Sequence, residues 1–128
     1  MKKLIIILLA VMLLTACGQD TEKDQGAVYV NITAEEAKQI MDSEEGYIIL
    51  DVRTQEEYDQ GHIPGAILIP DTEVEVTAEE VLTDKDQLIL VYCRSGRRSK
   101  LASEILVELG YTNIKEFGGI IDWPFEVE

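Results

Sequence analysis

The sequence predicts an α/β domain in which helices cover a mainly parallel sheet. Short apolar strands alternate with helices from residue 28 onward, and parallel strands need such crossover connections. The segments 47–52 and 88–92 are largely apolar and rich in β-branched residues, which is typical of strands covered on both faces. The chain has 128 residues, which is enough for one continuous core and too few for two.

Three capping boxes predict where helices begin. In such a box a Thr side chain and a Glu three residues later each accept a hydrogen bond from the other's backbone N–H. The first predicts a helix over residues 33–41, the second a helix after residue 54, and the third a helix that starts at residue 77. The boxes are Thr33 with Glu36, Thr54 with Glu57, and Thr77 with Glu80.

The remaining elements follow from turn residues and apolar patterns. The segment 61–65, Gly-His-Ile-Pro-Gly, predicts a turn, and short apolar strands are expected at 66–69 and 114–117. The last helix should begin near Arg98 or Ser99 and end at Gly110, since glycine suits the residue after a helix. Its predicted buried stripe is Leu101, Ala102, Ile105, Leu106 and Leu109.

Composition excludes several classes of function. The chain has 11 basic and 25 acidic residues, a net charge of −14, so it should repel nucleic acid and cannot dock on anionic lipid through a basic face. With only two cysteines and one histidine, neither a disulfide scaffold nor a zinc cluster is expected. We therefore expect no metal, no cofactor and no nucleic-acid partner.

The first residues have the pattern of a secretory signal. Lys2 and Lys3 precede the apolar run 4–14, whose eleven residues would form about 16 Å of helix, short for a membrane span. The segment 14–18, Leu-Thr-Ala-Cys-Gly, resembles the lipobox of bacterial lipoproteins. The resemblance implies that residues 1–16 are removed and that Cys17 is acylated. An uncleaved anchor or an ordinary signal cut nearby are the alternatives.

The lipobox resemblance sets the domain organisation. Residues 17–27 would be the acylated cysteine with a polar, flexible tether, and residues 28–128 the folded domain. Two or more acyl chains anchor a protein stably where one does not. The expected location is therefore the extracytoplasmic side of a bacterial membrane.

The chemistry is concentrated in the segment 93–99, Cys-Arg-Ser-Gly-Arg-Arg-Ser. Cys93 follows the most strand-like segment and precedes the best helix, so its thiol should lie where backbone N–H groups converge at a helix N-terminus. This field should lower the pKa of the Cys93 thiol, and the three arginines suit an oxyanion.

The alternative for Cys93 is a small core residue. Charges directly after it argue against burial, and outside the cytoplasm a lone free thiol is an oxidation liability. We therefore expect a reactive thiol.

Four motifs together resemble a single-domain rhodanese, the thiosulfate sulfurtransferase family, over residues 34–123. The strings at 61–66 and 93–99 are specific, whereas the other two are weak alone. The motifs are Asp51-Val52-Arg53, Gly61-His62-Ile63-Pro64-Gly65-Ala66, Cys93-Arg94-Ser95-Gly96-Arg97-Arg98-Ser99, and Gly118-Gly119-Ile120 with Asp122-Trp123.

The resemblance implies a doubly wound sheet of about five parallel strands with helices on both faces, in a monomer. It implies that Cys93 takes sulfur from thiosulfate or a similar donor as a persulfide, which cyanide or a thiol then accepts. Backbone N–H groups from Arg94 through Ser95, Gly96 and Arg97 to Arg98 would hold the persulfide. Arg94 and Arg97 would bind the sulfonate, and Arg98 would brace the loop.

Other chemistries share this loop geometry. Cysteine-dependent phosphatases have an arginine six positions after the cysteine, where this chain has Ser99, so a phosphatase or arsenate reductase is disfavoured. A non-catalytic module that carries a persulfide or binds an anion remains the main alternative. Asp51 and Arg53 are expected to join neighbouring loops through an ion pair rather than to react, and His62 to brace its turn.

Overall fold

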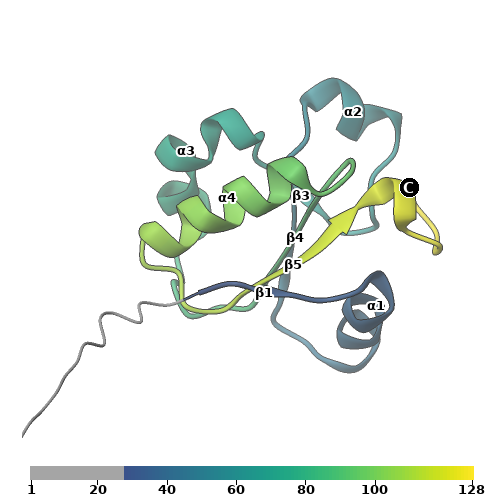
Figure 1. Cartoon of the computed structure of the whole chain (residues 1–128), viewed down its shortest axis with the longest axis horizontal. Helices are drawn as coiled ribbons and strands as arrows, with labels where there is room; N and C mark the ends of the chain where they lie inside the picture. The colour runs from purple at the N-terminus through teal and green to yellow at the C-terminus, as the bar shows by residue number, and fades with distance from the viewer. Residues whose placement is uncertain (1–27) are drawn as a thin grey trace, which may run out of the picture.

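The structure is a five-stranded, wholly parallel sheet with helices on both faces, as predicted (Figure 1). The computed structural model describes residues 28–128. The strands lie in the order β1-β5-β4-β2-β3, so β4 is central and the two-residue strands β1 and β3 form the edges. The strands are β1 (Val30–Asn31), β2 (Ile48–Asp51), β3 (Ile67–Leu68), β4 (Ile89–Cys93) and β5 (Ile114–Gly119).

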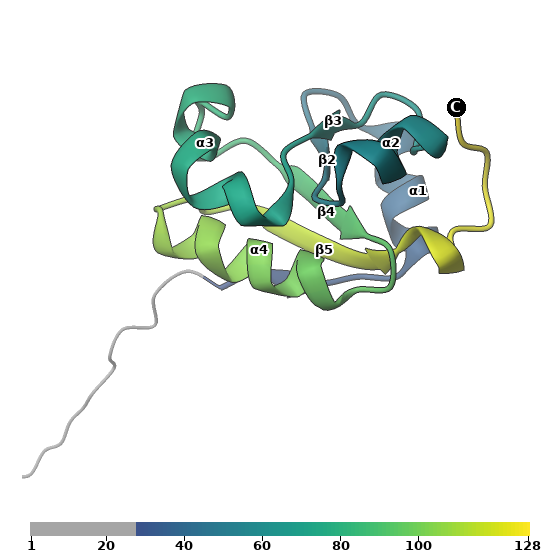
Figure 2. The same ribbon diagram turned by 90° about the horizontal axis from the view of Figure 1, so that it is seen from above.

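Four α-helices connect the strands. Two short 3₁₀ turns, Asp71–Glu73 and Ile120–Asp122, precede α3 and follow β5. In Figures 1 and 2, α3 and α4 lie side by side and α1 lies apart from them. The helices are α1 (Ala34–Ser43), α2 (Gln55–Gln60), α3 (Val74–Val81) and α4 (Arg97–Glu108).

The sheet separates two hydrophobic cores. On the face of α3 and α4, buried residues such as Val74, Ala102 and Leu106 pack on Val91 of β4. On the face of α1, Ala37 packs with an aromatic group from β4, β5 and the C-terminal segment. Its members are Tyr92, Phe117 and Trp123. Because successive strand residues point to opposite faces, Tyr92 and Cys93 belong to different cores.

Two of the three capping boxes are confirmed and one prediction is wrong. Thr33 and Thr54 are the N-caps of α1 and α2, each with the reciprocal Glu contact. By contrast, Thr77 lies inside α3, which begins at Val74 without any side-chain cap. Burial explains the earlier start, because Val74 and Ala78 lie four residues apart on the face that packs into the core.

The predicted buried stripe of α4 is wrong at its first member. Leu101 is 44% exposed, and the buried positions of this helix are Ser99, Ala102, Ser103 and Leu106. Two of these are serines, which an apolar pattern does not detect. The helix face that contacts the sheet is therefore partly polar. Ser99, one of the two serines, lies in the first turn of α4 and contacts Cys93.

The predictions for the signal, for Cys17 and for the tether concern residues outside the described part of the chain. Within residues 28–128, none of the helices has the length and apolar character needed to cross a bilayer.

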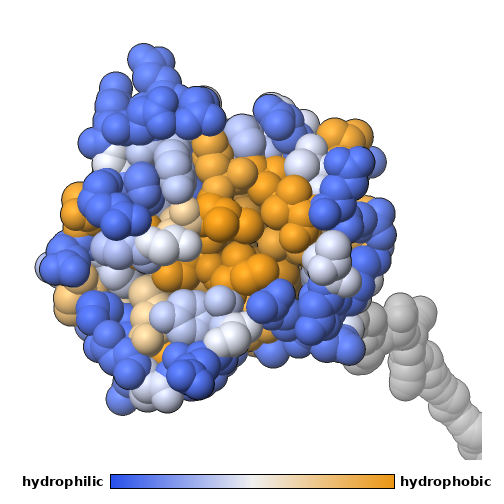
Figure 3. All heavy atoms as spheres, turned by 180° about the vertical axis from the view of Figure 1, so that it is seen from behind, coloured by the Kyte–Doolittle hydropathy of each residue, from blue (hydrophilic) through white to orange (hydrophobic). Residues whose placement is uncertain are grey.

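Seen from behind, apolar side chains gather in the middle of the surface and hydrophilic residues surround them (Figure 3).

Candidate active site

Cys93 is the last residue of the central strand β4, at the carboxyl edge where ligands of parallel sheets bind. Val91 pairs with Glu116 and Cys93 with Gly119, so β5 has one more residue than β4 in this interval. Such a bulge changes the direction of side chains near it. The expectation that flanking charges keep Cys93 from being buried is wrong, because the residue is 1% exposed. The chain leaves the strand here, so Arg94 reaches solvent while the cysteine side chain packs inward.

The Cys93 sulfur nevertheless has polar neighbours. The backbone N–H of Gly96 donates to Sγ at 3.0 Å, and the thiol donates to Ser99 Oγ at 3.4 Å. Gly96 is the N-cap of α4 with φ of 110°, a left-handed conformation that glycine adopts without strain. The loop therefore turns back over the sulfur and directs an amide at it.

The loop rests directly on the end of β5. The backbone N–H of Ile121 donates to the carbonyl of Arg94 at 3.2 Å. A Cβ at Gly119 would lie 2.0 Å from that same carbonyl oxygen, and backbone atoms cannot yield as a flexible side chain can. A glycine at this position is thus required for the close approach of β5 to the loop.

The three loop arginines fall into two groups. Arg98 forms a bidentate pair with Glu57 of α2, with N–O distances of 2.8 and 3.0 Å. The Arg98 hydrogen bonds hold the pKa of Glu57 at about 2, below its usual 4.5. Arg94 and Arg97 are exposed, and neither forms an ion pair with any of residues 28–128. Arg98 therefore joins the loop to α2, while two guanidiniums stay available to an anion.

Asp51 and Arg53 form a buried cluster with Tyr92. The Arg53 guanidinium contacts both Asp51 oxygens, at 2.7 Å for the shortest distance, and also donates to the carbonyl of Gly61. Tyr92 donates to Asp51 at 2.6 Å and accepts from the N–H of Ile63. Burial lowers the pKa of Arg53, but the hydrogen bond and charge of Asp51 outweigh it and raise the pKa. The expected ion pair is present, and it fixes the turn at residues 61–63.

Glu116 of β5 is a site residue that sequence analysis missed. It is 1% exposed, and its Oε2 accepts a hydrogen bond from Ser99 Oγ at 2.5 Å. Ser99 in turn contacts Cys93, so a buried carboxylate lies one hydroxyl away from the thiol. The usable signal was the period of two in β5, which places Glu116 on the same face as the core residue Ile114.

His62 lies in the turn and contacts residues other than Cys93. Its ring stacks on Tyr58 at 3.8 Å, Nδ1 lies 3.0 Å from the Tyr58 carbonyl, and Nε2 lies 3.3 Å from Glu128. These contacts agree with a turn-bracing role. In the described part of the chain, no three His, Cys, Asp or Glu side chains gather as metal ligands.

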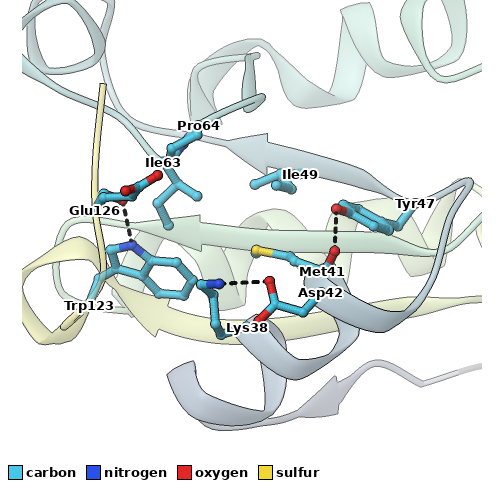
Figure 4. A pocket seen from close by; sticks show the side chains of 9 residues that line it. All are labelled: Lys38, Met41, Asp42, Tyr47, Ile49, Ile63, Pro64, Trp123 and Glu126. Atoms are coloured by element: carbon cyan, nitrogen blue, oxygen red, sulfur yellow. Dashed lines mark hydrogen bonds and ion pairs between the residues drawn. The ribbon is translucent and has the colours of Figure 1, made fainter.

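A cavity of about 180 Å³ lies on the face of α1, away from Cys93 (Figure 4). The residues that line it include Met41, Ile49, Ile63 and Trp123. The last three belong to the core that contains Tyr92, and Met41 packs against that core, whereas Cys93 belongs to the other core. Figure 4 shows the Lys38–Asp42 ion pair at its rim. The sheet thus separates this cavity from the thiol.

The comparisons with known proteins point to one family. Residues 33–124 match the Rhodanese-like domain family. The chain is 45% identical over 73 residues to the thiosulfate sulfurtransferase PspE of Escherichia coli (strain K12). This match covers 57% of this chain and 70% of that protein. It is 38% identical over 112 residues to YrkF of Bacillus subtilis (strain 168), whose name describes a sulfur carrier protein. That match covers 87% of this chain and 60% of that protein.

A solved structure shows the same fold. The structure described as a rhodanese with anions from E. coli matches with a TM-score of 0.60 and 40% sequence identity. The match covers 64% of this chain and 96% of that one.

Proposed function

This chain belongs to the rhodanese family, and on that premise we propose that it transfers sulfane sulfur through a persulfide on Cys93. The observation that supports it most is the position of Cys93 at the carboxyl end of β4, under a loop whose Gly96 amide points at the sulfur. A thiolate is the reactive form of cysteine, and an amide donor stabilises it or a persulfide anion.

The proposed donor is thiosulfate or a similar anion. The Cys93 thiolate attacks the outer sulfur, the S–S bond of thiosulfate breaks, and sulfite leaves with the bonding electron pair. A persulfide remains on Cys93, and a thiol, or cyanide in an assay, then removes its outer sulfur. Arg94 and Arg97 are the proposed contacts of the sulfonate, because they are exposed and form no ion pair within residues 28–128.

A persulfide carrier is the second candidate. The match to YrkF supports it, because that protein is named for carrying sulfur. The two candidates differ in turnover. An enzyme converts many equivalents of thiosulfate, whereas a carrier holds a single sulfur atom until a partner removes it.

The proposed location is the extracytoplasmic side of a bacterial membrane, with Cys17 acylated. Support comes from the lipobox-like segment 14–18 and the short apolar run before it. Replacing Cys17 by Ser should release the protein from the membrane fraction, and an unacylated N-terminus at Cys17 in the intact mass would contradict the proposal.

The test of sulfur transfer uses the full chain and the Cys93→Ser variant. After thiosulfate, the tryptic peptide 86–94 should gain one sulfur atom on Cys93, and further addition of cyanide should release thiocyanate over many turnovers. Cys17→Ser is the matched control, because it removes the other cysteine and should retain this activity. Equal thiocyanate production by Cys93→Ser would contradict the mechanism, and persulfide formation without turnover would favour the carrier.

A further inference from the structure

Glu116 is a buried carboxylate for which the sulfur chemistry above has no role. A buried charge is unfavourable unless hydrogen bonds or opposite charges satisfy it, and Glu116 has both. Its Oε1 accepts from Asn31 Nδ2 at 2.6 Å and lies 3.9 Å from Lys100 Nζ. Its Oε2 accepts from the N–H of Gly118 at 3.0 Å and from Ser99. The surroundings therefore suit an ionised carboxylate.

Ser99 links this carboxylate to the thiol. Its single hydroxyl proton has three acceptors within reach: Glu116 Oε2 at 2.5 Å, the Gly96 carbonyl at 3.0 Å and the Gly118 carbonyl at 3.4 Å. The charged and nearest acceptor is the strongest, so the proton is directed at Glu116. An oxygen lone pair of Ser99 then faces Cys93, whose S–H donates to it.

We propose that Glu116 receives, through Ser99, the proton that Cys93 loses when it becomes a nucleophile; this rests on the proposed function. The S–H bond of Cys93 breaks as its proton bonds to Ser99 Oγ. The original O–H bond of Ser99 breaks as that proton bonds to Glu116 Oε2. Cys93 ends as a thiolate, Ser99 is again a hydroxyl, and Glu116 is a neutral carboxylic acid. No electron is gained or lost.

The product arrangement holds the thiolate. The Ser99 hydrogen now faces the sulfur, and the new O–H of Glu116 donates to Ser99 Oγ. The three groups carry one negative charge before and after, so activation adds no second buried anion. When the acceptor removes the outer sulfur, Cys93 leaves as a thiolate and recovers its proton along the same path.

The charged and titratable groups that face this relay come from α4 and from the segment before β1. Lys100 of α4 faces Glu116, and Tyr29 lies near it, with a pKa raised by burial and by the charges of Glu104 and Glu116. Arg98, also of α4, is held in its ion pair with Glu57. Ser99 contacts the reacting sulfur, whereas Glu116 acts through Ser99 and is a positioning residue.

The test measures how pH changes the rate at which iodoacetamide alkylates Cys93 in the full chain, read from the peptide 86–94. Glu116→Gln keeps the shape of the side chain but cannot take the proton. We expect its rate near neutral pH to fall by about 10²-fold and to approach that of the unsubstituted protein in alkaline solution, where hydroxide ionises the thiol. Ser99→Ala breaks the same path and should give the same profile. Glu108→Gln removes an equal charge from an exposed position of α4 and should leave the profile unchanged.

Three results would overturn the relay. The first is a Glu116→Gln profile equal to that of the unsubstituted protein, and the second is slowing by one factor at every pH, which would mean that Glu116 only shapes the loop. The third is faster alkylation, which would mean that its charge opposes the thiolate. If Glu116→Gln does not fold, Ser99→Ala decides by the same criteria. Iodoacetamide donates no sulfur, so a failed thiosulfate reaction with these profiles intact would reject the function and keep the relay.

Discussion

Two buried polar clusters lie at the carboxyl end of β4, and each contains one of the last two residues of that strand. Tyr92 joins Asp51 and Arg53, and Cys93 joins Ser99 and Glu116. Each cluster contains one carboxylate that is 0% or 1% exposed. The two clusters differ in the group that faces this carboxylate. Asp51 faces a guanidinium, which keeps its protons in proteins, whereas Glu116 faces a hydroxyl next to a thiol.

The difference shows how two clusters of similar burial can have different roles. In the Asp51 cluster every proton has a fixed place, and the result is a turn held in one position. In the Glu116 cluster a thiol, a hydroxyl and a carboxylate are joined in a row by hydrogen bonds, which is the geometry that the proposed proton transfer requires. The contrast predicts that damage to the first cluster lowers stability, whereas damage around the second lowers reactivity.

The largest expected effect comes from Arg53→Met, which removes the cation from the Asp51 cluster. This leaves Asp51 buried without its cation, and loss of one partner from a buried pair costs about 3–5 kcal/mol of unfolding free energy. Denaturant unfolding of the full chain measures it. The alkylation rate of Cys93 in the folded variant should stay unchanged, because Arg53 makes no contact with the thiol cluster.

The matched control for Arg53→Met is the double variant with Asp51→Asn. Removing both charges should cost less than the two single losses added together, since no unpaired charge remains. If the loss of unfolding free energy in the double variant equals the sum of the losses in the two single variants, the ion pair does not hold the turn.

The next effect concerns the loop over Cys93, through Gly119→Ala. The new Cβ would lie 2.0 Å from the Arg94 carbonyl oxygen, so the loop must move away from β5. A displacement of about 1 Å at a reacting group can reduce a rate by about 10²-fold, so persulfide formation should fall by that order. Gly65→Ala is the control, because nothing lies within 4 Å of its Cβ position. Its φ of 85° adds backbone strain that Gly119, with φ of −129°, does not have, so the control overstates the strain of Gly119→Ala and lacks only its steric clash. Equal losses of persulfide formation in the two variants would contradict the steric explanation.

The smallest effect concerns the pair that joins the loop to α2. The pKa of Glu57 is lowered to about 2 from 4.5, so its contribution to stability is complete above pH 4.5 and is lost as the pH falls towards about 2. Both side chains are 24% exposed, and pairs near the surface contribute at most about 1 kcal/mol. Glu57→Gln keeps the capping box, so the difference in unfolding free energy from the unsubstituted protein should disappear near pH 2. A difference that persists there would show that the ion pair is not its source.

Sequence patterns predicted the fold because its elements depend on local signals. Apolar runs located the central strands β2 and β4, and capping boxes located α1 and α2. Where tertiary burial decides, the patterns failed. Core packing of Val74 starts α3 before the capping box at Thr77, and polar contacts of Ser99 turn α4 so that Leu101 faces solvent.

The site was predicted in part for the same reason. The loop at 93–99 is contiguous, so its charges and glycine are visible in sequence. Glu116 is 17 residues from Ser99, and only the pairing of β5 with β4 and the packing of α4 bring the two together. An acidic residue in a short apolar strand is a weak signal unless its neighbours in space are known.

The burial of Cys93 also limits the size of what can react with it. At 1% exposure, the sulfur is reached only by reagents slender enough to enter beneath the loop. The terminal sulfur of a small anion such as thiosulfate, the donor proposed above, meets this requirement, whereas a bulky electrophile does not. The loop would thus act as a steric filter that also keeps bulky oxidants from the sulfur.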